Sequence, residues 1–245
     1  MIETQNLCKS FKDKKRGQIK AVDNVSIRCE PGKIYGLLGA NGAGKTTTLR
    51  ILATILQPTS GRATVAGFDV VTHPDEVRQQ VGFLSTATAL YARLTALEMV
   101  QYFGRLHGLD EEALSKRIED VFTRLDMNSF RDQRCDKLST GMKQKVSIAR
   151  TLVHDPAVMI FDEPTNGLDV MTARTIVGFI RDCRAAGKTV IFSSHVMSEV
   201  EKLCDNIGII HDGKILTEGT LPQLKEKFGM NDLEDVFVHV VGDKK

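Results

Sequence analysis

Four residues follow the spacing G-x-x-x-x-G-K-[ST], which is typical of a loop that binds phosphate: Gly39, Gly44, Lys45 and Thr46. Glycines let backbone N–H groups approach an anion closely, because no Cβ blocks the way. The lysine adds a positive charge for the β- and γ-phosphates, and the threonine hydroxyl suits Mg²⁺. The pattern predicts a site for a nucleoside triphosphate and Mg²⁺, formed by Gly39, Asn41, Gly42, Ala43, Gly44, Lys45, Thr46 and Thr47.

Two adjacent carboxylates, Asp162 and Glu163, follow an apolar run at residues 157–161. Successive side chains at a strand end point in different directions, so the two should have different tasks. Asp162 would hold Mg²⁺ through its water shell, and Glu163 would orient or deprotonate an attacking water. A solvated acidic strand end is the alternative, but the phosphate-binding pattern upstream favours the metal and water roles.

Two further candidates carry weaker signals when each is taken alone. Ser139 precedes a helical pattern that is rich in basic residues, so it could contact phosphate or simply cap the helix. His195 ends the apolar run at residues 189–193, and a lone histidine is more often structural than functional.

The elements that must position these residues alternate between strand and helix. Buried-strand patterns occupy residues 34–38, 81–85, 157–161 and 189–193, and helical spacing covers 45–56 and 171–186. This alternation predicts an α/β fold with a parallel sheet, in which ligands bind beyond the carboxyl ends of the strands. Gly39, Ser85, Asp162 and His195 all lie at such ends, so we expect them at one edge of the sheet.

The remaining segments suggest one domain with an insertion. Strand patterns at residues 1–9 and 21–29 flank a basic loop at 12–17, and Phe11 precedes this loop, where it could stack on an adenine ring or belong to the core. Residues 62–68 read as a strand, and residues 207–211 and 214–218 as a hairpin. Helical spacing dominates residues 88–150, which we interpret as an inserted helical subdomain. Residues 221–245 should form a helix plus a tail, which gives a domain at 1–225 and a C-terminal tail at 226–245.

Composition restricts the class of protein. The 33 basic and 31 acidic residues give a net charge of +2, so there is no electrostatic reason to expect nucleic acid as a partner. The five scattered cysteines form no C-x-x-C pair, which argues against a zinc site and favours a reducing compartment. The sequence shows no signal peptide and no apolar stretch of the roughly 20 residues that span a bilayer. A membrane role would therefore need a partner that holds the chain there.

Taken in order, these motifs resemble those of ATP-binding cassette (ABC) transporter ATPases over nearly the whole chain. The order is a P-loop at 39–46, a signature-like Leu-Ser-Thr-Gly-Met at 138–142, a Walker B run into Asp162 and Glu163, a D-loop at 166–169 and a switch histidine, His195. The resemblance implies a P-loop NTPase fold of the ABC nucleotide-binding type. This fold has a RecA-like core sheet, an antiparallel β subdomain and an inserted α-helical subdomain.

The resemblance also implies a mechanism in which two copies face each other head to tail and sandwich ATP and Mg²⁺. Ser139 and Gly141 would serve the ATP of the second copy. Glu163 resembles the catalytic base of the family and His195 its γ-phosphate sensor. Phe11 resembles the aromatic that stacks on adenine, and Asp169 the D-loop acid that links the two sites.

Two departures from the family pattern are visible. Alignment of residues 81–86 places Thr86 where most members carry a glutamine that reaches the metal. A threonine hydroxyl is shorter, so Thr86 would reach Mg²⁺ through water. Thr140 replaces the first signature glycine and Met142 the glutamine, while Ser139 and Gly141 are kept.

Residues 82–91, 138–145 and 233–237 resemble the sodium-efflux branch of bacterial ABC exporters. This implies an ATPase subunit on the cytoplasmic face of the cell membrane, which powers Na⁺ efflux through a separate permease subunit. The alternatives are a drug or other small-molecule exporter and a soluble ABC ATPase acting on nucleic acid or ribosomes. A regulatory ATP binder is disfavoured by Glu163. The apolar, aromatic segment at 87–106 is either a docking groove for the permease or part of the helical core.

Overall fold

A six-stranded sheet forms the centre of the computed structural model, which describes residues 1–13, 17–85 and 89–242. Its strands are β4 (Ile34–Leu38), β7 (Val81–Ser85), β8 (Val158–Asp162), β9 (Thr189–Ser194), β10 (Asn206–His211) and β11 (Lys214–Gly219), in the spatial order β11-β10-β4-β9-β8-β7. Neighbouring strands are parallel, except for the antiparallel hairpin of β10 and β11. Every residue of β4, β8 and β9 is buried, as their apolar runs predict. The predicted parallel sheet is confirmed.

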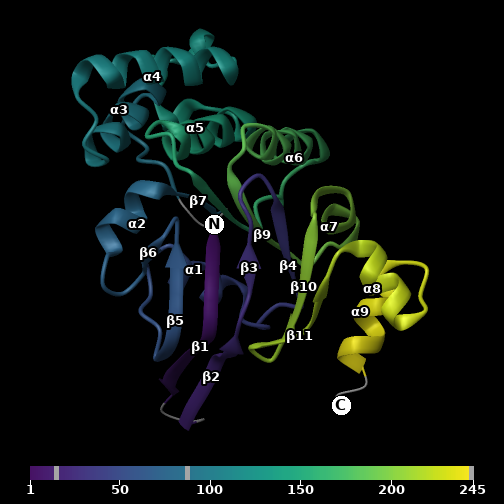
Figure 1. Cartoon of the computed structure of the whole chain (residues 1–245). Coiled ribbons are helices and arrows are strands. Elements are labelled where there is room, and N and C mark those ends of the chain that lie inside the picture. Colours follow the sequence, from purple (N-terminus) through teal and green to yellow (C-terminus); the bar gives the residue numbers. More distant parts are fainter. Residues whose placement is uncertain (14–16, 86–88, 243–245) are drawn as a thin grey trace.

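A second sheet, which is antiparallel, is built on β1 (Ile2–Asp13) (Figure 1). This strand pairs with β2 (Gly17–Val25), β3 (Arg28–Cys29) and β5 (Ser60–Val65), and β5 pairs with β6 (Phe68–Asp69). The segment predicted as one strand over residues 62–68 is divided in two. Ala66 and Gly67 both have positive φ, 52° and 90°, so the chain turns between β5 and β6.

Helix α1 (Lys45–Leu52) packs against strands of both sheets. Its Leu49 shares one apolar cluster with Leu7 of β1 and Ile160 of β8. The sequence predicted a helix through residue 56, but α1 ends at Leu52 because Thr54 adopts a φ of 58° that a right-handed helix cannot contain. Helix α2 (Pro74–Gln80), which the sequence did not predict, connects β6 to β7.

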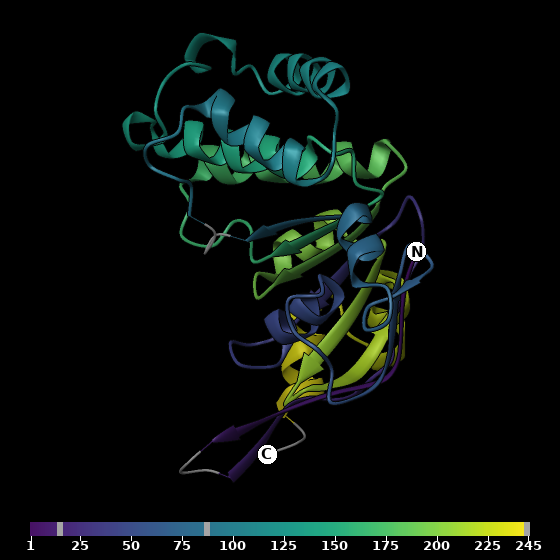
Figure 2. The same ribbon diagram turned by 90° about the vertical axis from the view of Figure 1, so that its left-hand side faces the viewer.

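The predicted helical insertion contains α3 (Ala96–Leu106), α4 (Glu111–Arg124) and α5 (Thr140–Leu152), with 3₁₀ turns at Asn128–Phe130 and Cys135–Lys137. Figures 1 and 2 show these helices grouped at one end of the molecule. Each begins at a side-chain cap, provided by Thr95, Asp110 and Ser139 respectively. Amphipathic spacing directs Val100, Ile118 and Val146 into one core that continues to Phe161 of the central sheet.

Helices α6 (Val170–Ala185) and α7 (Met197–Leu203) follow β8 and β9, and α8 (Leu221–Phe228) and α9 (Leu233–Gly242) end the described chain. The C-terminal part differs from the expected helix plus tail, because the proposed boundary between residues 225 and 226 lies inside α8. Leu233 and Val236 of α9 are fully buried in the main core, so α9 packs as part of the domain. Hydrophobic burial on one face of α9 explains why this segment is not a free tail.

Candidate functional site

The turn after β4 has the backbone that the phosphate-binding pattern predicts. A Cβ on Gly39 would lie 2.5 Å from the carbonyl oxygen of Ile210, and one on Gly44 would lie 2.4 Å from that of Ala21. Gly44 also has a φ of 106°, a conformation that L side chains rarely adopt. Only glycine therefore fits at both positions, and the turn brings the N-terminus of α1 to the edge where β4 ends.

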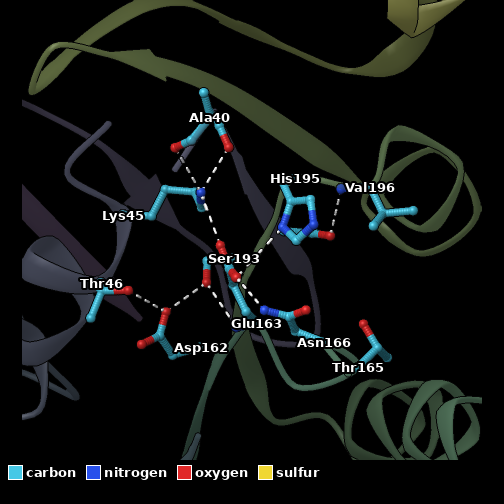
Figure 3. Close-up of polar contacts among 12 residues, drawn as sticks. Ala40, Lys45, Thr46, Asp162, Glu163, Thr165, Asn166, Ser193, His195 and Val196 are labelled. Atoms are coloured by element: carbon cyan, nitrogen blue, oxygen red, sulfur yellow. Dashed lines mark hydrogen bonds and ion pairs between the residues drawn. The ribbon is translucent and has the colours of Figure 1, made fainter. Parts of the chain in front are cut away.

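Lys45 carries the charge of this turn and is nearly fully buried, with 4% of its surface exposed. Its Nζ donates to the carbonyl oxygens of Gly39 at 2.7 Å and Ala40 at 3.0 Å, and it forms an ion pair with Glu163 Oε1 at 3.0 Å (Figure 3). The turn thus holds a positive charge in a fixed place, next to the carboxylate that the sequence predicted to activate water.

Asp162 lies at the end of β8 and joins two neighbouring elements. Its Oδ1 accepts hydrogen bonds from Thr46 Oγ1 and from Ser193 Oγ of β9, both at 2.9 Å. The Ser193 hydroxyl in turn accepts from the backbone N–H of Glu163 at 3.0 Å. These bonds fix the ends of β8 and β9 and the start of α1 relative to one another, so the two proposed metal-site oxygens face each other.

Glu163 occupies a strained position, with a φ of 45°. Its Oε2 accepts from Asn166 Nδ2 at 3.2 Å and lies 3.5 Å from His195 Nδ1 (Figure 3). Burial would raise the pKa of Glu163, but the hydrogen bond and charge of Lys45, with His195, hold that pKa below its usual value. The side chain is therefore an ionised carboxylate at neutral pH, as a water-activating base must be.

A cavity of about 220 Å³ lies over this turn. Its walls are Ala21, Asn41, Gly42, Gly44, Lys45, Thr46, Thr47 and Glu163. Gly39 and Ala43 belong to the same turn and are buried, Ala43 with 4% exposure. The structure thus brings together the predicted phosphate-binding residues with Asp162, Glu163 and His195.

Phe11 lies on β1, where it pairs with Ile19 of β2. Its side chain is 40% exposed, and Lys9 Nζ lies 5.2 Å from the ring centroid, so the alternative of a core residue does not hold. Strand β2 contains Ala21, which is one of the walls of the cavity. The hairpin therefore carries an exposed aromatic on the strand pair that borders the cavity.

Ser139, Gly141 and Asp169 lie elsewhere, at the first turns of α5 and α6. Ser139 caps α5, and its Oγ accepts from Met142 N at 3.3 Å. Asp169 caps α6 by accepting from Met171 N and from both the amide and the hydroxyl of Thr172. Within the described ranges, none of the three lines the cavity over the turn. Thr86 lies outside the described residues, while Ser85 before it pairs in register with Asp162.

Sequence reasoning missed Ser193, which joins Asp162 to Glu163. The only signal was a hydroxyl at the end of a buried strand, directly before Ser194 and His195. It also missed the ion pair between Lys45 and Glu163, because residues 118 positions apart gave no local pattern.

Comparisons with known proteins agree with this geometry. The family model described as ABC transporter matches residues 22–166. The ABC transporter ATP-binding protein NatA of Bacillus subtilis is 45% identical over 239 residues, which are 97% of each chain. The bacitracin transport ATP-binding protein BcrA of Bacillus licheniformis is 36% identical over 228 residues, which are 93% of this chain and 72% of that protein.

Solved structures share the fold. An ATP-binding subunit of an ABC transporter matches with a TM-score of 0.87 at 25% identity, over 98% of this chain and 99% of the other. The dimeric bacterial ABC transporter cassette MJ0796 matches with a TM-score of 0.80 at 27% identity, over 90% and 99%; its dimer is also known in a post-hydrolysis state bound to ADP and Pi. In the described part of the chain, no helix has the length and apolar character needed to cross a membrane. The chain therefore belongs to the ABC transporter family, as an ATP-binding subunit that hydrolyses ATP.

Proposed function

We propose that this chain is the ATPase subunit of a bacterial exporter that expels Na⁺ through a separate permease. The observation that carries the ATPase part is the contact of Glu163 with both Lys45 and His195 at the edge of the cavity. The resemblance of residues 82–91, 138–145 and 233–237 to the sodium-efflux branch supports the choice of Na⁺. A drug substrate is the second candidate, because a bacitracin transport ATP-binding protein and a linearmycin resistance ATP-binding protein are 36% and 33% identical to this chain.

In the proposed reaction, Lys45 and the backbone N–H groups of the turn bind the phosphates of ATP. Phosphate oxygens that enter the cavity would compete with Glu163 for Lys45. Release of the Glu163 carboxylate would then allow it to accept a proton from the attacking water. His195, within 3.5 Å of Glu163, would donate to the γ-phosphate.

The residues where β8 ends and α1 begins fit Mg²⁺. Thr46 Oγ1 and Asp162 Oδ1 lie 2.9 Å apart, and hydroxyl and carboxylate oxygens are the ligands that this hard cation prefers. We assign Thr46 as a direct ligand, Asp162 as a ligand of its water shell and Thr86 as a further water-mediated contact. When bound, Mg²⁺ supplies positive charge that stabilises the phosphate oxygens.

We further propose a head-to-tail dimer, in which Ser139 and Gly141 contact the ATP of the second copy. This follows from their position at the start of α5, away from the walls of the cavity in their own chain. Asp169 would lie at the same interface. The two residues after it, Val170 and Met171, are 70% and 69% exposed, which is typical of apolar side chains that a partner covers.

The described part of the segment at 87–106 contains both core and surface residues. Leu90, Leu94 and Phe103 pack against the main core, whereas Tyr91, Tyr102 and Leu106 are 55%, 43% and 63% exposed. The rings of Tyr91 and Tyr102 meet edge to face, with centroids 5.8 Å apart. We propose that this exposed group contacts the permease, which would hold the chain at the cytoplasmic face of the membrane.

The test is transport by the complex of this chain with the proposed permease, identified as a multi-spanning membrane protein that co-purifies with it. We expect ATP-dependent ²²Na⁺ movement in proteoliposomes, absent when the chain carries Glu163→Gln. Movement of a cationic drug without Na⁺ movement would support the second candidate and contradict the first. ATP turnover that rises with DNA, RNA or ribosomes and needs no permease would contradict both.

A further inference from the structure

Helix α7 begins two residues after His195, and its first turn contains Glu199. The carboxylate Oε2 of Glu199 accepts a hydrogen bond from Thr165 Oγ1 at 3.0 Å and another from Ser194 Oγ at 3.2 Å. Thr165 follows Glu163 by two residues, and Ser194 directly precedes His195. One carboxylate therefore joins the loop that carries the proposed base to the loop that carries the proposed sensor.

The Ser194 hydroxyl has a second bond that makes this connection specific. It accepts from the backbone N–H of Val196 at 2.9 Å, so it closes a turn around His195. Because this hydroxyl also donates to Glu199, the turn is attached to helix α7. The backbone of His195 is thus fixed by its two chain neighbours and by one carboxylate on α7.

The ring of His195 has little else to fix it. Its Nδ1 is buried and makes no hydrogen bond with any described residue, and it lies 3.5 Å from Glu163 Oε2. At that separation a shift of well under 1 Å decides whether the two groups interact. The direction of the ring therefore depends on the backbone turn, and through the turn on Glu199.

We propose that Glu199 is a positioning residue for ATP hydrolysis, which acts through Ser194 and Thr165 to set His195 against Glu163. The proposal rests on the roles proposed above for these two residues. Glu199 does not touch the cavity, so it should affect the rate of the chemical step more than the binding of ATP. Ser193 holds the same two loops on the metal side, so the fold should survive without Glu199.

The test compares Glu199→Ala with a matched variant on the same helix. Glu201→Ala removes a carboxylate that also has two partners, Leu233 N at 3.2 Å and Lys225 Nζ at 3.5 Å, but faces the C-terminal helices. For the full chain with its permease, we expect Glu199→Ala to lower kcat about tenfold with KM for ATP nearly unchanged, and Glu201→Ala to change kcat by less than about twofold. Glu199→Gln, which keeps an acceptor oxygen, should recover part of the loss.

A double-mutant cycle shows whether the effect passes through His195. If it does, Glu199→Ala adds no further loss of kcat to His195→Ala. Equal losses in Glu199→Ala and Glu201→Ala, or full additivity with His195→Ala, would overturn the positioning role. Glu163→Gln is measured beside them: normal turnover in that variant would overturn the proposed site itself, whereas its failure to turn over leaves the Glu199 result to be judged alone.

Discussion

The first turns of α1 and α5 differ in what surrounds them. Thr46 in the first turn of α1 is tied to β8 through Asp162, and Lys45 to the loop after β8 through Glu163. At the start of α5, the Ser139 hydroxyl has one bond to a described residue, which it accepts from Met142 N in its own turn. Both helix starts are suited to phosphate. In the head-to-tail dimer proposed above, the first helix start is prepared within one chain, whereas the second would meet the ATP held by the other copy.

The largest effect on this comparison is expected from Glu163→Gln, which changes the site at the start of α1 and leaves the start of α5 intact. Glutamine cannot accept a proton from water, so turnover should fall by about 1,000-fold, while ATP binding remains. ATP should then hold two copies together, which light scattering can detect as a dimer. A monomer in saturating ATP, or undiminished hydrolysis, would contradict the assignment.

Lys45→Ala removes the fixed charge of the same site. Loss of charge-assisted bonds to phosphate, each about 1.5–3 kcal/mol, should weaken ATP binding about 100-fold. Isothermal titration calorimetry measures this directly. Lys33→Ala, at the opposite end of β4 and 53% exposed, serves as the control and should bind ATP normally. Equal affinity in the two variants would show that Lys45 does not contact the nucleotide.

Ser139→Asp tests the start of α5 without removing the helix cap. Aspartate caps helices as well as serine does, so stability should hold, but its negative charge would repel the phosphates of the second copy's ATP. We expect turnover to fall about tenfold or more with ATP affinity of the single chain unchanged, and Glu163→Gln/Ser139→Asp to form no ATP-dependent dimer. The matched change Thr220→Asp, at the cap of α8, should leave both properties intact.

A smaller effect concerns the boundary between the helical subdomain and the sheet. His154 stacks on His107 with ring centroids 3.5 Å apart, and its Nε2 bonds the carbonyl oxygen of Val81 at 3.1 Å. Burial, with the nearby His107, lowers the pKa of His154 from 6.5 to about 4. Between pH 6.5 and 4, His154 therefore binds a proton in the unfolded chain but stays neutral in the folded chain.

The free energy of unfolding is therefore at its full value above pH 6.5, and it falls progressively as the pH is lowered from 6.5 through 4. In this window His154 should lower the free energy of unfolding by up to about 1.4 kcal/mol for each unit by which the pH falls. Urea unfolding at several pH values should give a flatter dependence for His154→Gln than for the parent chain. His73→Gln, an exposed histidine beside α2, should keep the parent slope. Identical slopes in all three chains would count against a neutral, buried His154.

The parts predicted from sequence are those with a local cause. Apolar runs located β4, β7, β8 and β9, and the glycine spacing located the phosphate-binding turn. The α1 end was missed because a single positive φ at Thr54 stopped the helix. The prediction of a C-terminal tail was wrong because local spacing does not show that Leu233 is buried against a core that is distant in the sequence.

Long-range polar contacts could not be predicted for the same reason. Neither the bond from Thr165 to Glu199 nor the bond from Thr46 to Asp162 follows from a periodic pattern. The Asp169 cap shows a further difficulty. The family pattern predicted a link between two sites, which stays a prediction, and the structure shows the Asp169 carboxylate as the cap of α6.

The hairpin of β1 and β2 offers a practical use. Cys8 lies half-exposed on β1, three residues before Phe11. Burial raises the pKa of the other four thiols, Cys29, Cys135, Cys183 and Cys204, so they remain poor nucleophiles at neutral pH. A maleimide dye should therefore label Cys8 first, on the strand that presents the proposed adenine-stacking ring. The natural chain could then report the arrival of ATP by fluorescence without any substitution.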